Sequence, residues 1–135
     1  ETYAKGGAGS VLISADNAHA LHPNYPEKHD PHHACVLGGG PVIKVNANQR
    51  YATTDEMQAL IKDVARKAKI KPLQHFVARS DMGCGSTIGP ITAAEVGVKT
   101  LDLGVPTFAM HSIREMAAVS DIETTATLFK EFFRD

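Results

Sequence analysis

The sequence lacks several features that mark particular classes of protein. Its 135 residues include two cysteines and no tryptophan. Cys35 and Cys84 lie far apart and have no CxxC spacing, so the sequence predicts neither a zinc knuckle nor a required disulfide bond. We therefore expect a reducing, cytoplasmic environment for the chain.

An excess of one charge sign and a long apolar run are also missing. The 14 basic and 15 acidic side chains give a formal net charge of −1, so nothing in the charge balance predicts nucleic-acid binding. No apolar run reaches the roughly 18 residues that a membrane-spanning helix requires, and no signal peptide is visible. The chain starts at Glu1 without a methionine, and its first ten residues read like the interior of a protein. We expect a piece of a longer chain.

The residues that are present suit one globular domain, because 43% of them are hydrophobic. In the second expected strand, Ile43 and Val45 share one face and Lys44 lies on the other. The first expected strand is a continuous apolar run and should be buried on both faces. Short apolar or alternating runs predict strands at residues 10–14, 41–46, 74–79, 99–106 and 107–111.

The clearest predicted helix covers residues 53–69, and Thr53 with Glu56 resembles a capping box at its start. Its apolar residues follow helical spacing at Met57, Leu60, Ile61, Val64 and Ala68. A second helix is expected at 91–97, with Pro90 in its first turn and Gly97 as its C-cap. Since strands and helices alternate, the sequence predicts an α/β fold with a parallel or mixed sheet.

A final helix is expected after Ser120, which with Glu123 resembles another capping box. Ile122, Phe129 and Phe133 should share its apolar face, widened by Leu128 and Phe132. Residues 22–40 are rich in turn-forming residues and predict a long loop, and long ordered loops are often functional.

Two metal-competent side chains each follow an expected strand. Asp16 comes directly after the first strand, within the stretch SADNAHALHPN, and His111 ends the last one. In open α/β sheets, ligands collect at the carboxyl ends of strands, so the two groups can converge. Carboxylate with imidazole suits zinc, and also manganese or cobalt. From spacing alone, a turn residue and a half-buried histidine are the more ordinary interpretation.

Other candidates are weaker or open. His29, His32, His33 and Cys35 resemble a second metal cluster, but their proline-rich surroundings favour a surface loop. Lys44 needs a partner if the sheet is covered on both sides, and either an anionic ligand group or a structural carboxylate would serve. The glycine-rich stretch at 81–90 lacks the lysine of a P-loop and is better explained as a tight turn leading into a helix N-terminus.

Several stretches together resemble the carboxy-terminal part of the M18 metallopeptidases, the aspartyl aminopeptidases. The resemblance runs in order over nearly the whole chain, through SADNAHALHPNY, GPVIKVNANQRYAT, SDMGCGSTIGPI, LDLGVP and AMHSIREMA. It implies an α/β/α sandwich of the zinc-peptidase type, present here only as its C-terminal portion across residues 1–135. It also implies two zinc ions, with manganese or cobalt as alternatives, and a cytoplasmic homo-oligomer, typically a dodecamer.

The resemblance also assigns roles to residues. It implies that Asp16 is a ligand of one metal ion, that His111 is a ligand of the other, and that His19, Lys44 and Tyr51 bind the substrate. The substrates would be peptides with an acidic N-terminal residue, and an ammonium group such as that of Lys44 suits a carboxylate. The roles imply neither a nucleic-acid partner nor a membrane.

The family's remaining metal ligands and its general-base glutamate have no matching motif in the chain. We therefore expect no catalytic residue here, and an isolated 135-residue chain should be inactive. The alternative is a non-catalytic binding or assembly module that retains remnant site residues. An intact-mass measurement on the source material would separate the two interpretations.

Overall fold

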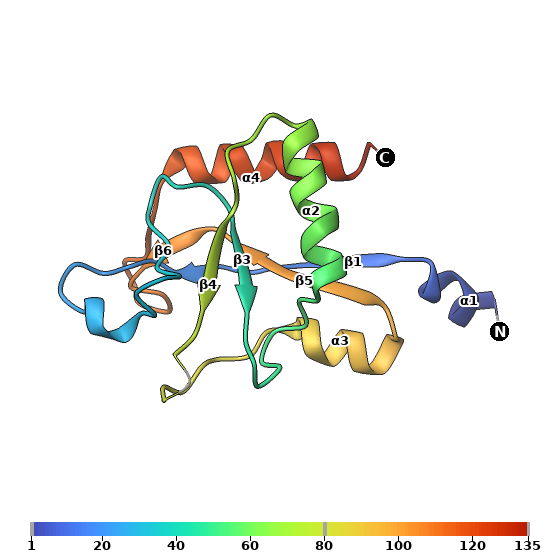
Figure 1. The fold of residues 1–135 in the computed structure, drawn as a ribbon, viewed down its shortest axis with the longest axis horizontal. Coiled ribbons are helices and arrows are strands. Elements are labelled where there is room, and N and C mark those ends of the chain that lie inside the picture. The colour runs from blue at the N-terminus through green and yellow to red at the C-terminus, as the bar shows by residue number, and fades with distance from the viewer. Residues whose placement is uncertain (1, 80, 135) are drawn as a thin grey trace.

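The computed structural model describes residues 2–79 and 81–134. Its helices lie on both faces of a central sheet, so the predicted α/β/α arrangement is confirmed (Figure 1). The helices α2 (Asp55–Lys67) and α4 (Val119–Phe132) pack together on one face, and α3 (Ile88–Val96) packs against the other. A further helix, α1 (Thr2–Ala8), lies at the N-terminal end of the chain (Figure 1).

Two sheets are formed, and the larger one is mixed. Its strand order is β1-β5-β3-β4, in which β1 runs parallel to β5, β3 parallel to β4, and β3 antiparallel to β5. A smaller sheet has the order β2-β6-β7. The strands are β1 (Val11–Ala15), β2 (Ala18–His19), β3 (Val42–Val45), β4 (Gln74–Val77), β5 (Lys99–Gly104), β6 (Pro106–Phe108) and β7 (Met116–Ala117), and a 3-10 turn covers Pro26–Lys28.

Both faces of the central strands are buried, and the charged side chains lie on one of them. Ile43 joins Leu101 and Leu103 in the main core beneath α2 and α4. Lys44 and Asp102 lie on the opposite face, because successive side chains of a strand alternate. The predicted separation of Lys44 from Ile43 is therefore correct.

Helix α2 confirms the main sequence prediction but begins at Asp55, two residues after the start of the predicted range. It buries Met57, Ile61 and Val64 against the core, as the helical spacing predicted. The N-cap is Thr54, whose side chain accepts a hydrogen bond from Met57 N, so the capping box assigned to Thr53 is wrong. The hydroxyl of Thr53 instead accepts a hydrogen bond from the backbone N–H of Asp102 at 3.0 Å.

Helix α4 exists, and it places Leu128, Phe129 and Phe132 against the core as predicted, but Ile122, Phe133 and the cap depart from the prediction. Ile122 is 54% exposed and Phe133 is 81% exposed. The residues that α4 buries are Asp121, Thr125 and Leu128. The helix starts at Val119 after Ala118, which makes no side-chain cap, so Ser120 does not form the expected capping box. The carboxylate of Asp121 turns inward because it accepts hydrogen bonds from Gly38 N and Gly40 N, at 2.7 and 2.8 Å.

Three other predictions can be judged from the strands and α3. The first strand lies at the edge of its sheet, and Val11, Leu12 and Ile13 are only partly buried, so burial on both faces is wrong. The strand expected to reach His111 ends at Phe108. The C-cap of α3 is Gly97 with a φ of 71°, as predicted. None of the helices in the described part of the chain is long and apolar enough to cross a membrane.

Candidate active site

The candidate site is built on two strand pairs that continue one another. β1 pairs with β5 and β2 with β6, so the chain segments 11–19 and 99–108 run side by side. The bend between the pairs is tight, because a Cβ on Gly104 would lie 1.6 Å from the carbonyl oxygen of Asp16. This position therefore requires glycine, and the close approach puts Asp16 and His19 next to the segment that leads to His111.

Asp16 and Lys44 form the charged centre of the site. The Lys44 side chain is 2% exposed, and its ammonium nitrogen lies 3.5 Å from Asp16 Oδ2. It also donates a hydrogen bond to the carbonyl oxygen of Asn17 at 3.1 Å. Burial lowers the pKa of Lys44, and the carboxylates of Asp16 and Asp102 oppose that shift. Asp16 is 58% exposed and has room for a further partner.

His19 connects the predicted site residues. Its pKa is lowered, first by partial burial and then by the positive charges of His111 and Lys44, whereas Asp16 raises it. These effects require all three groups to lie near the His19 imidazole. His19 is therefore within electrostatic range of Asp16, Lys44 and His111, of which Asp16 and Lys44 are in direct contact at 3.5 Å.

His111 lies in a turn rather than at a strand end. Its φ is 68° and that of Ala109 is 53°, a left-handed conformation that is uncommon outside glycine. The backbone N–H of His111 donates a hydrogen bond to Glu115 Oε1, which helps to hold the turn. Strained residues of this kind cluster at functional sites, which favours a role for the exposed imidazole.

Tyr51 lies beside Lys44 and contacts the glycine-rich segment. The Lys44 ammonium nitrogen is 5.1 Å from the centre of the Tyr51 ring, a cation–π contact. The Tyr51 hydroxyl is 3.0 Å from Cys84 Sγ. Burial, and then the hydrogen bond with Cys84, raise the pKa of Tyr51, so the phenol stays neutral. Tyr51 itself is 8% exposed.

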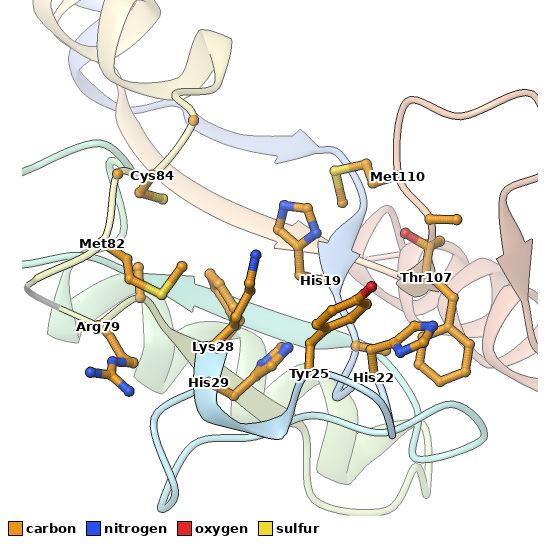
Figure 2. Close-up of a pocket in the computed structure, with 17 residues that line it drawn as sticks. His19, His22, Tyr25, Lys28, His29, Arg79, Met82, Cys84, Thr107 and Met110 are labelled. Atoms are coloured by element: carbon orange, nitrogen blue, oxygen red, sulfur yellow. The ribbon is translucent and has the colours of Figure 1, made fainter.

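A pocket of about 440 Å³ opens beside His19 (Figure 2). In this view His19 lies between Cys84 and Met82 on one side and Met110 and Thr107 on the other (Figure 2). The expected long loop contributes further lining residues, namely His22, Tyr25, Lys28 and His29. The loop thus contributes to a pocket beside the candidate site.

The histidines of that loop make separate contacts. His33 pairs with Asp30 at 2.8 Å, and Cys35 donates from Sγ to the carbonyl oxygen of His19 at 3.0 Å. Burial raises the pKa of the Cys35 thiol to about 11, so it stays protonated at neutral pH. His29 Nδ1 is buried in the pocket wall and makes no hydrogen bond within the described residues. Cys35 and Cys84 are both free thiols.

The glycine-rich segment leads into α3, as expected. Thr87 is the N-cap and accepts a hydrogen bond from Gly89 N at 3.3 Å. The Thr87 hydroxyl also donates to Asp102 Oδ1 at 2.5 Å. The sequence reasoning missed Asp102, although one signal was visible, namely a carboxylate within an apolar strand that must find partners when buried.

The metal-binding side chains of the candidate site suit a metal ion only in part. Asp16 and His111 offer a carboxylate and an imidazole, which are zinc-type donors. Within residues 2–79 and 81–134, no group of three or more histidine, cysteine, aspartate or glutamate side chains is placed to hold a metal ion. The described residues therefore fit zinc by their chemistry but do not complete a site.

A mixed sheet covered by helices on both faces, with a carboxylate and a buried lysine beside its strand ends, is an α/β domain of the kind in which ligands bind at the carboxyl ends of the strands. The chain belongs to the M18 peptidase family. Residues 2–133 match the family model described as aminopeptidase I zinc metalloprotease (M18), which confirms the resemblance that the sequence motifs carried.

Similar proteins include curated relatives and solved structures. A probable M18 family aminopeptidase 2 from Pseudomonas aeruginosa is 56% identical over 124 residues, which is 92% of this chain and 29% of the relative. A chain in the cryo-EM structure of the Ape4 and Nbr1 complex matches with a TM-score of 0.95 and 48% identity, over 98% of this chain and 25% of that one. The S. cerevisiae mApe1 dodecamer matches with a TM-score of 0.86 and 32% identity, over 98% and 28%.

The chain spans less than a third of the length of the relatives it matches. The similarity therefore covers only one part of each relative. The candidate residues Asp16, His19, Lys44, Tyr51 and His111 of this chain lie within the matched part.

Proposed function

We propose that residues 1–135 form the C-terminal portion of the catalytic domain of an M18 aminopeptidase that removes acidic residues from peptide N-termini. The observation that carries this proposal is the contact of the buried Lys44 with Asp16 at 3.5 Å, beside the strand pair that holds His19, with His111 within electrostatic range of His19. A metal-type carboxylate, two imidazoles and a buried cation at one edge suit a peptidase that handles an anionic substrate.

In this proposal Asp16 is a ligand of one zinc ion and His111 of the other, and manganese or cobalt would be accepted by the same donors. When bound, such ions would activate water for attack on the peptide bond. The exposure of Asp16 supports the assignment, because its side chain is still 58% exposed although Oδ2 contacts Lys44 and Oδ1 accepts a hydrogen bond from the Asn17 backbone N–H at 2.8 Å. Lys44 would orient that carboxylate.

His19, Lys44 and Tyr51 are the proposed substrate-binding residues. The Lys44 ammonium is desolvated, and a desolvated cation interacts strongly with a carboxylate that enters its surroundings. His19 borders the pocket of about 440 Å³, which would receive the peptide. The lowered pKa of His19 keeps its imidazole neutral near pH 7, so that it can both accept and donate hydrogen bonds.

The isolated chain is proposed to be inactive, because it holds two candidate ligands and no assigned general base. The complete enzyme would be a homo-oligomer, as the dodecamer of the similar mApe1 supports, and its proposed location is the cytoplasm. Neither nucleic acid nor a membrane is a proposed partner.

The test is a substrate profile of the full-length enzyme and of the 135-residue chain. The full-length enzyme should show a higher kcat/KM for N-terminal aspartyl and glutamyl substrates than for an alanyl substrate. The isolated chain should cleave none of them. Preferential cleavage of the alanyl substrate would contradict the proposed specificity, and turnover by the isolated chain would contradict its inactivity.

A further inference from the structure

Asp102 is a fully buried carboxylate that no role in the proposed function uses. It lies on β5 between Leu101 and Leu103, with an exposed fraction of 0%. One carboxylate oxygen accepts from the Ala52 backbone N–H at 2.6 Å, and the other accepts from the Thr87 hydroxyl at 2.5 Å. Every oxygen of this buried side chain is therefore engaged with a different loop.

The two loops that Asp102 holds are the ones that meet at the candidate site. Ala52 directly follows Tyr51, and Thr87 lies three residues after Cys84. The Tyr51 hydroxyl contacts Cys84 Sγ at 3.0 Å. Asp102 therefore binds both loops through hydrogen bonds, and the contact between Tyr51 and Cys84 joins the same two loops at the site.

The local packing leaves little room for another arrangement. A Cβ on Gly89 would lie 2.5 Å from Asp102 Oδ2, so the start of α3 comes directly against the carboxylate. A carboxylate at this place is stabilised by the N-terminal end of a helix dipole. Asp102 also acts on the proposed substrate-binding residues. Burial lowers the pKa of Lys44 and the carboxylate of Asp102 opposes this, whereas burial raises the pKa of Tyr51 and Asp102 adds to the increase.

We propose that Asp102 is a positioning residue that clamps the Tyr51 loop to the Cys84–Thr87 loop and so sets the geometry in which Tyr51 and Lys44 receive an acidic substrate residue. The inference rests on the proposed function of Tyr51 and Lys44. It extends that function to a residue to which the sequence analysis assigned no role and which does not line the pocket.

The experiment compares four variants of the full-length enzyme. Asp102→Asn keeps the shape of the side chain but replaces one acceptor with a donor that faces N–H and O–H groups. Thr87→Val removes one bond of the clamp, and Thr87→Ser restores the hydroxyl. Asp121→Asn is the matched control, because Asp121 is also buried, at 1% exposure, and also accepts backbone N–H groups, but on α4.

Two readouts are taken from each variant. The first is the ratio of kcat/KM for an aspartyl substrate to that for an alanyl substrate, which a loss of folded enzyme alone would not change. We expect this ratio to fall on the order of 10- to 100-fold in Asp102→Asn and Thr87→Val, and to stay at the wild-type value in Thr87→Ser and Asp121→Asn. The second is the rate at which a maleimide labels Cys84, followed by peptide mass spectrometry.

Labelling of Cys84 should become about tenfold faster in Asp102→Asn and Thr87→Val, because the clamp no longer holds its loop. The fully buried Cys35 is the internal reference. Unchanged Cys84 labelling would overturn the clamp whatever the substrate preference. Faster labelling with an unchanged ratio would overturn the positioning role. A wild-type enzyme without acidic preference would instead contradict the proposed function, and with it the inference.

Discussion

Lys44 brings an ammonium group into the interior of the domain beside an exposed carboxylate. Burying an amine is costly unless it is paired, and Asp16, the Asn17 carbonyl oxygen and the Tyr51 ring together provide the compensation. The sequence left open whether an anionic ligand or a structural carboxylate balances this lysine. The structure provides Asp16 as a carboxylate partner, and the proposed substrate would bring a second.

Replacing Lys44 with Met keeps the length of the side chain and removes its charge. In the full-length enzyme, kcat/KM for an aspartyl substrate should fall roughly 10- to 150-fold, since a charge-assisted hydrogen bond is worth about 1.5–3 kcal/mol. Activity on an alanyl substrate should fall much less, because that side chain makes no such contact. Steady-state kinetics on both substrates measure the difference.

Lys62→Met is the control, because Lys62 is an exposed residue of α2 away from the site. It should leave both substrates unaffected. If Lys44→Met reduced the two activities equally, Lys44 would support the site, for example by orienting Asp16, rather than read the substrate.

Helices were predicted correctly where the sequence shows a clear periodicity or a local end signal. The helical spacing of Met57, Ile61 and Val64 identified α2, and a glycine at the right place identified the end of α3. The burial of Leu128 on α4 followed the predicted spacing, but the inward position of Asp121 was not predicted, because this residue binds a loop about 80 residues away and only the tertiary fold creates that contact.

The sequence indicates candidate residues for the site, but it does not indicate how the chain positions them. The position of Asp16 after an apolar strand is visible in the sequence. The left-handed turn at His111 is not visible in the sequence, because no residue type near it marks a position with positive φ. The two-residue strand β2 is too short for any periodicity to indicate it, although it places His19 beside β6.

The contact between α4 and the triple-glycine loop gives a prediction for a pair of elements. Asp121→Asn should weaken the bonds from Gly38 and Gly40, so their amides should exchange with solvent roughly 10-fold faster or more. Hydrogen–deuterium exchange of the peptide that covers residues 36–41 measures this. Thr54→Ala, which removes the cap of α2, should leave that peptide unchanged. Equal exchange in Asp121→Asn and wild type would show that these bonds do not hold the loop.

At the scale of the whole molecule, the chain carries a fold that its relatives contain within a longer protein. Its two candidate ligands belong to different metal ions in the proposed site, whereas a closed zinc site uses four ligands. The isolated chain should therefore bind no stoichiometric tight zinc in calorimetry. One tight zinc per chain would contradict this, and would favour instead the loop that carries His29, His32, His33 and Cys35.

The central claim is that Asp16 and His111 are metal ligands of a complete M18 aminopeptidase, and the zinc content of the purified full-length protein tests it most directly. The wild type should hold about two zinc ions per subunit by elemental mass spectrometry. Asp16→Asn and His111→Gln should each lose about one of them, and Lys62→Met should lose none. If both ligand variants retained the zinc content of the wild type, the assignment of Asp16 and His111 would be wrong.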